Sequence, residues 1–224
     1  MSAAPEERRS AAALRSRVAA LLMEDDGPAA LAGLAALPLR PAIRELQGLL
    51  PSAEPLVRFR AATALGRLGV ALAREDLEAG RDLLRRLMWS LNDESGGIGW
   101  GAPEAMAEIM AGHEGLAAEF GHLLVSYLVP GANRLECEAL ARGALWGLCR
   151  LLETRPDLAR EAEPELVRLL READPERRGL AALALARLGT RPTAINPGLA
   201  RDETEIGLYA EWRLSRVKVK DLAG

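Results

Sequence analysis

The sequence predicts an all-α fold, an α-solenoid of about five helical pairs that ends in a short C-terminal β-hairpin. Three observations lead to this prediction: an apolar helical stripe that recurs about every forty residues, prolines that separate the copies, and an aliphatic composition. Apolar residues make up 49% of the 224 residues and aromatic residues only 4%. The helices must therefore pack through aliphatic and small side chains, as stacked helical pairs do. A chain of this length folds without needing a disulfide or a metal.

The recurring stripe has a small residue at positions i and i+3 and a large apolar residue at i+4 and i+7. This spacing is typical of one face of an α-helix. The stripe occurs four times, at steps of 41, 39 and 40 residues. The small side chains let a neighbouring helix approach closely. The four copies are Ala61-Ala64-Leu65-Leu68, Ala102-Ala105-Met106-Ile109, Ala141-Ala144-Leu145-Leu148 and Ala181-Ala184-Leu185-Leu188.

Each stripe helix is preceded by a partner helix, and two further helices come before the first pair. We expect the partner helices at 41–50, 79–91, 115–129 and 157–171, and the N-terminal helices at 5–24 and 28–37. Pro103 falls in a first helical turn, where its missing N–H costs little. Asp174 before Pro175 is a good N-cap. We divide the chain into a solenoid at 1–192, with a cap at 1–40 and repeats at 41–192, and an extension at 193–224.

The extension contains a predicted β-hairpin within residues 206–220. Leu208, Val217 and Val219 stand among polar residues at near two-residue spacing, the period of a half-buried strand. We expect the turn at 212–215 and place Lys218 and Lys220 on the solvent side. A hairpin is marginally stable alone, so it should dock on the helices.

Two segments also resemble the HEAT-repeat family. Residues 57–69, VRFRAATALGRLG, look like the second helix of a HEAT repeat of the phycobilisome-lyase-like type, and residues 178–189 are a looser copy. The resemblance covers about residues 40–190. The whole chain also looks like a group of bacterial HEAT-like proteins with a Gly-rich loop in mid-chain. HEAT resemblance implies a scaffold or binding surface more often than an enzyme, and it transfers no catalytic residues.

The helical wheel of the stripe helices predicts a binding face. Phe59, Trp100 and Trp146 fall on the side away from the core stripe, which in HEAT stacks lines the concave surface. We expect a non-enzymatic protein-binding scaffold, because exposed aromatic side chains dominate interfaces. The alternative is that the rings pack between repeats or lie under the hairpin. The predicted groove residues are Phe59, Trp100, Glu104, Arg142 and Trp146, with Arg60, Arg67 and Glu108 also around them.

The Gly-rich loop at 92–101 is the second candidate binding element. Its glycines let the backbone approach a ligand, and we include Asn92, Asp93, Glu94, Gly96, Gly97 and Gly99 in the predicted surface. Two alternatives remain open: a connection in which Asn92 caps a helix and Ile98 fills the core, and a cation site of Asn92, Asp93 and Glu94. The loop does not match the phosphate-binding patterns of nucleotide-binding proteins.

The charge and motif content leaves one enzyme alternative. A net charge of −3 and a pI near 5.6 argue against a binder of phosphate backbones. The alternative is a HEAT-like DNA glycosylase acting on alkylated bases, with Trp89, Asp93, Trp100, Arg142 and Trp146 near one another. The pair His113-Glu114 resembles those of HEAT-type di-iron hydroxylases, but it occurs once where those enzymes repeat it. We expect no metal, no cofactor and no catalytic residue.

The cysteines and the N-terminus indicate a location. Cys137 and Cys149 form no CxxC motif, and neither a signal-peptide pattern nor a run of about 20 apolar residues is present. The expected location is therefore cytoplasmic, with no membrane contact. The expected partner is another protein or a peptide segment, and nucleic acid is not favoured. Edge-to-edge pairing of the hairpin would also permit a homodimer.

Overall fold

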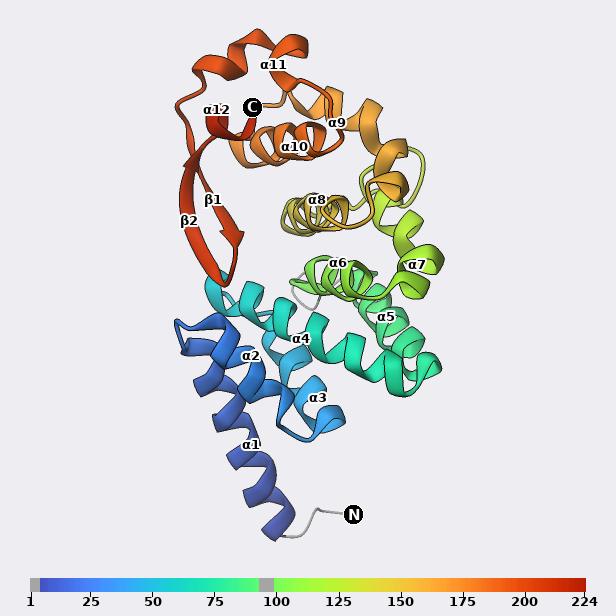
Figure 1. Ribbon diagram of the computed structural model, residues 1–224, viewed down its shortest axis with the longest axis vertical. Helices are drawn as coiled ribbons and strands as arrows, with labels where there is room; N and C mark the ends of the chain where they lie inside the picture. Colours follow the sequence, from blue (N-terminus) through green and yellow to red (C-terminus); the bar gives the residue numbers. More distant parts are fainter. Residues whose placement is uncertain (1–4, 93–98) are drawn as a thin grey trace.

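The computed structural model describes residues 5–92 and 99–224 (Figure 1). The chain is mostly helical, and one two-stranded antiparallel sheet lies near its C-terminus. The predicted all-α class with a C-terminal hairpin is therefore confirmed. No helix in the described part of the chain has the length and apolar character to cross a membrane.

The helices follow the predicted order. The N-terminal part consists of α1 (Pro5–Met23), α2 (Gly27–Ala35) and α3 (Leu39–Leu49). The central part consists of α4 (Pro55–Glu75), α5 (Leu77–Leu91), α6 (Ala102–Gly112), α7 (Glu114–Ser126), α8 (Glu138–Leu152), α9 (Glu163–Leu169) and α10 (Pro175–Arg187). The end holds α11 (Pro192–Ile195), a 3₁₀ turn at Pro197–Arg201, β1 (Glu205–Ala210), β2 (Arg213–Lys218) and α12 (Val219–Leu222).

One predicted α-helix is partly a 3₁₀ helix. The segment expected as a continuous helix over 157–171 begins as a 3₁₀ helix at Pro156–Ala162 and becomes α-helical only in α9. Pro164 explains the break, because it has no N–H to donate to the carbonyl four residues before it. It stands instead in the first turn of α9, where that donor is not needed.

The stripe helices form the inner row of the molecule. In Figure 1, α4, α6, α8 and α10 follow one another along the middle, and α5, α7 and α9 lie on the side away from the hairpin. Successive members of the inner row pack directly on each other. Every stripe residue is buried except Leu188, which is half-buried because α10 ends at Arg187. The predicted core face is thus correct in all four copies.

The α4–α6 contact depends on Gly66. A Cβ on Gly66 would collide with the Cβ of Glu108 and lie 3.1 Å from the backbone carbonyl carbon of that residue. Backbone atoms cannot move aside as a flexible side chain can, so the two helices would have to separate.

We therefore expect Gly66→Ala to lower the free energy of unfolding by about 2 kcal/mol, as overpacked cores do. Urea denaturation measures the change. Gly48→Ala is the control, because Gly48 is an exposed position of helix α3 with nothing within 4 Å of the added carbon. This change should stabilise by up to about 1 kcal/mol, because alanine favours helix more than glycine does. Equal effects of the two substitutions would contradict the packing argument.

The hairpin spans the open side of the inner row, from α10 to the N-terminal helices (Figure 1). Its register pairs Glu205 with Lys218 and Ala210 with Arg213. The turn is formed by Glu211 and Trp212, both with positive φ (49° and 69°), so it begins one residue before the predicted 212–215. The second strand ends at Lys218, and Val219 and Lys220 belong to α12. Lys218 and Lys220 are partly exposed and pair with Glu203.

The tip of the hairpin is anchored in the N-terminal helices. The Trp212 indole N–H donates to the Glu24 carbonyl oxygen at 2.8 Å, and Arg60 Nε donates to the Trp212 carbonyl oxygen at 3.0 Å. The Trp212 side chain also lies directly on Gly27, where an added Cβ would come within 2.6 Å of it. These contacts hold two non-glycine residues in a conformation that L-residues rarely adopt.

Glu211 has positive φ without an anchor for its exposed side chain. Glycine adopts this conformation without steric cost, so Glu211→Gly should raise the free energy of unfolding by about 1 kcal/mol. Thermal or urea unfolding checks this. A loss of stability would show that the positive φ carries no strain.

Candidate functional site

Beneath the hairpin lies a cluster of three aromatic rings. Tyr209 of β1 stacks on Phe59 of α4, with ring centroids 4.9 Å apart and planes at 9°. Trp146 of α8 contacts both rings, and its indole N–H donates to the Tyr209 carbonyl oxygen at 3.0 Å. Trp146 is 7% exposed and Phe59 is half-buried. The prediction that these two rings lie open along a groove is therefore wrong, because the hairpin covers them.

Arg60 also lies elsewhere than predicted. Its side chain is buried rather than at a groove rim, since it donates to the carbonyl oxygens of Leu22 and Trp212. The guanidinium lies 5.3 Å from the Trp212 ring centroid. Arg60 thus joins α4, α1 and the hairpin. Arg67 is exposed but does not line a cavity with Phe59, Trp100 and Trp146, so it also lies elsewhere than predicted.

A groove of about 1270 Å³ opens on one side of the hairpin. It is bounded by the start of α2, by the inner helices and by the tip of the hairpin. Its apolar floor includes Leu31, Leu183 and Leu208. The charged residues that line it are Asp25, Asp26, Glu108, Arg150, Glu153, Arg187, Glu211 and Arg213.

The charges on the helical wall of the groove are paired in a row. Arg150 Nε donates to Glu108 at 3.0 Å, Arg150 also pairs with Glu153 at 2.9 Å, and Arg187 pairs with Glu153 at 2.7 Å. Thr63 donates its hydroxyl to the second oxygen of Glu108 at 3.1 Å. These residues come from α4, α6, α8 and α10, so the row crosses the inner helices and presents alternating charge.

A smaller cavity of about 150 Å³ lies on the other side of β1. All five residues predicted for the partner groove line it: Phe59, Trp100, Glu104, Arg142 and Trp146. Arg58 and Glu176 line it as well. The five residues predicted from the helical wheel therefore do lie together, but around a small, partly open cavity beside the hairpin rather than along a continuous open face.

Glu104 is the most unusual residue of this cavity. It is 4% exposed, and its carboxylate packs against Gly143 of α8 so closely that a Cβ there would lie 2.7 Å from an oxygen. Its Oε2 has no hydrogen-bond partner among the described residues. Desolvation raises the pKa of Glu104 to about 7, although its own backbone N–H and the charge of Arg58 oppose that rise.

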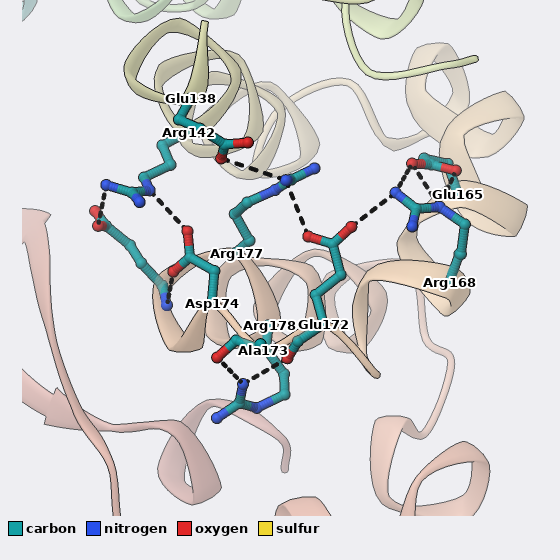
Figure 2. A network of polar contacts seen from close by, with 10 residues as sticks. Glu138, Arg142, Glu165, Arg168, Glu172, Ala173, Asp174, Arg177 and Arg178 are labelled. Carbon is teal, nitrogen blue, oxygen red and sulfur yellow. Dashed lines mark hydrogen bonds and ion pairs between the residues drawn. The ribbon is translucent and has the colours of Figure 1, made fainter. Parts of the chain in front are cut away.

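Arg142 is held in place by α10. Its Nε donates to Asp174 at 2.9 Å, and its Nη1 lies 3.7 Å from Glu176. Figure 2 shows this pair beside a chain of ion pairs that runs from Glu138 through Arg177 and Glu172 to Arg168. Asp174 is also the N-cap of α10, so the predicted cap is confirmed. The same carboxylate therefore caps the helix and pairs with Arg142.

The predicted loop surface is mostly untested. Asp93, Glu94, Gly96 and Gly97 lie outside the described residues, as does Ile98. Asn92 is the C-cap of α5. Gly99 is buried, and an added Cβ would lie 2.9 Å from the Ser90 carbonyl oxygen, so this position is packed rather than open to a ligand.

The residues considered for enzymatic chemistry are dispersed. Trp89 is 79% exposed on α5 and lines neither cavity, whereas Trp100, Arg142 and Trp146 share the smaller one. His113 caps α7 by accepting the Leu116 N–H on Nδ1. Within 5–92 and 99–224, no group of three or more His, Cys, Asp or Glu residues is arranged to hold a metal.

Cys149 lines the groove as a protonated thiol. Burial raises its pKa to about 12, and Sγ lies 3.3 Å from the Leu180 carbonyl oxygen as a donor. A nucleophilic role at neutral pH is thereby disfavoured, because the thiolate is the reactive form.

Several residues that line these cavities were not predicted from the sequence: Arg58, Arg150, Glu153, Glu176, Arg187, Tyr209 and Trp212. Arg150 and Arg187 follow Trp146 and Leu183 by four residues, one helical turn on the same face, and this spacing was available in the sequence. The position of Tyr209 over Phe59 depends on where the hairpin docks, and no local signal reports that.

No protein-family model matches the chain. An uncharacterized protein of Archaeoglobus fulgidus is 29% identical over 174 residues, which are 75% of this chain and 86% of that protein. A crystal structure described as that of an engineered protein overlays with a TM-score of 0.43 at 20% identity, covering 84% of each chain.

Proposed function

We propose that the chain is a HEAT-like α-solenoid that binds an extended segment of another protein in the groove beside its hairpin. The groove of about 1270 Å³ carries this proposal. Its volume exceeds the range of about 300–1,000 Å³ that small-molecule sites have. It also combines an apolar floor with charged walls, as protein-recognition surfaces do. The hairpin forms one wall, so the bound segment would contact both the helices and the extension.

The charges of the groove indicate the chemistry of the segment. Near the hairpin tip, Glu211 and Asp25 are exposed acids, although Asp25 also lies 3.4 Å from Arg60, and Asp26 caps the start of α2 beside them. Farther along, Arg187 and Arg150 face the groove from α10 and α8. A segment with a basic residue near the tip and an acidic residue that takes the place of Glu153 on Arg187 would match this distribution.

The DNA glycosylase alternative is less well supported. Acidic residues outnumber arginines on the groove lining, five to three, and this disfavours a phosphate backbone. Trp89, which that alternative places near Trp100 and Trp146, lies on outer helix α5 and lines neither cavity.

Site-specific photo-crosslinking in the native cell tests the proposal. A photoreactive residue at Leu183, on the groove floor, should crosslink to a discrete partner, and peptide mapping of the adduct should place the link in an extended segment. The same residue at Leu77, an exposed position on outer helix α5, is the matched control and should give no such adduct.

Crosslinks at Leu77 but not at Leu183 would move the binding surface to the outer helices. Release of methylated bases from DNA by the purified protein would replace the scaffold proposal with the glycosylase one.

A further inference from the structure

The smaller cavity contains two opposite charges that do not pair with each other. Arg58 of α4 and Glu104 of α6 both line it, yet no ion pair joins them within 4 Å. Arg58 donates Nη1 to the Ser52 carbonyl oxygen, and its guanidinium lies 5.8 Å and 5.7 Å from the ring centroids of Phe59 and Trp100. The described residues provide it with no carboxylate partner.

Two buried polar atoms of the same cavity, one acceptor and one donor, have no hydrogen-bond partner among the described residues. Glu104 Oε2 is an acceptor without a donor, and Trp100 Nε1 is a donor without an acceptor, among the residues that the structure describes. Leaving such atoms unpaired in a protein interior is costly, and native structures contain few of them. A ligand that carries both a donor and an acceptor would satisfy both.

The remaining charges of the cavity are already compensated. Arg142 of α8 is paired with Asp174 and lies 3.7 Å from Glu176, both of α10. Gly207 of β1 closes the cavity without a side-chain charge. Arg58 and Glu104 are therefore the two charges of this cavity without an ion pair within 4 Å among the described residues, and the charge of nearby Glu176 acts on both of them.

We propose that this cavity binds a small zwitterion of the α-amino acid class, with the ligand ammonium donating to Glu104 and the ligand carboxylate accepting from Arg58 and the Trp100 indole. The volume of the cavity agrees with a small ligand, since about 150 Å³ corresponds to the space of about five water molecules at about 30 Å³ each. Phe59 and Trp146 provide apolar walls for a short side chain. The lining of this site shares Trp146 with the groove, but Arg58, Trp100 and Glu104 line the small cavity alone, so the test does not depend on the proposed protein partner.

The ionisation of Glu104 adds a second signature. Because its pKa is raised to about 7, it is mostly protonated at pH 6 and mostly ionised at pH 8. An ammonium group binds the ionised form, so affinity should rise by up to about tenfold between these pH values.

Calorimetric titration of the full chain with L-alanine tests the proposal. Propionate lacks the ammonium and ethylamine lacks the carboxylate, and each should bind at least tenfold more weakly than alanine. Glu104→Gln should weaken alanine binding at least tenfold at pH 8, whereas Glu153→Gln, the same change in the large groove, should leave it unchanged. We expect a Kd on the order of 0.1 mM. Ethylamine binding as tightly as alanine would overturn the proposal, as would the absence of alanine binding at about 10 mM, which is about a hundred times that Kd.

Discussion

Between pH 4.5 and pH 8, the free energy of unfolding of the Glu104→Gln variant is expected to rise by about 3 kcal/mol relative to that of the wild-type protein. The pKa of Glu104 is raised from 4.5 to about 7 by desolvation in the fold. Below pH 4.5 the carboxyl is protonated in both states and imposes no penalty. As pH rises towards 7, the unfolded chain loses the proton while the folded protein retains it, so wild-type stability falls. Each pKa unit corresponds to about 1.4 kcal/mol.

Urea denaturation of both proteins at pH 4.5, 6 and 8 measures this effect. The difference between the two proteins matters here, because it cancels the titration of all other groups. Glutamine keeps the size of the side chain against Gly143. A difference that does not change with pH would show that Glu104 does not carry an elevated pKa.

Trp212→Ala is expected to lower the free energy of unfolding by about 3 kcal/mol, in the range of large-to-small substitutions of buried aromatic residues. Trp212 is 5% exposed and joins the hairpin to α1 and α2 through its packing on Gly27 and its bond to Glu24. Without the indole, the hairpin tip loses its anchor, and backbone amides of β1 and β2 should exchange faster with solvent. Urea denaturation and hydrogen exchange measure the two effects.

Trp212→Gly separates the side chain from the backbone. Glycine adopts the φ of 69° at this position without steric cost, so Trp212→Gly should be more stable than Trp212→Ala by about 1 kcal/mol. If the alanine variant matched the wild type in stability and exchange, the hairpin would be held by contacts other than those of Trp212.

The sequence predicts the helical elements well because they depend on local periodicity. The stripe around Ala61 and its three later copies is buried as expected, since spacing along one helix determines one face of that helix. The hairpin was predicted from alternation, and its turn was displaced because Glu211 and Trp212 do not have the residue types of a two-residue turn.

The candidate site was predicted only in part because it forms between distant segments. The helical wheel predicted that Phe59, Trp100 and Trp146 lie on one side of the stripe helices. All three line the smaller cavity, so this part of the prediction is confirmed. The wheel could not show that Tyr209 covers Phe59 and Trp146, which depends on a contact across 63 residues with Trp146. Burial of Arg60 arises in the same way, from bonds to residues 38 and 152 positions away.

The affinity of the crosslinked partner segment for charge variants of the groove tests the proposed binding mode most directly. Arg187→Gln removes a charge that faces the groove, and Arg85→Gln removes a similarly ion-paired charge on outer helix α5. We predict that the segment binds Arg187→Gln about tenfold more weakly, a typical effect of losing one charged interface contact, and binds Arg85→Gln as it binds the wild type. Equal binding to all three proteins would contradict recognition in the groove.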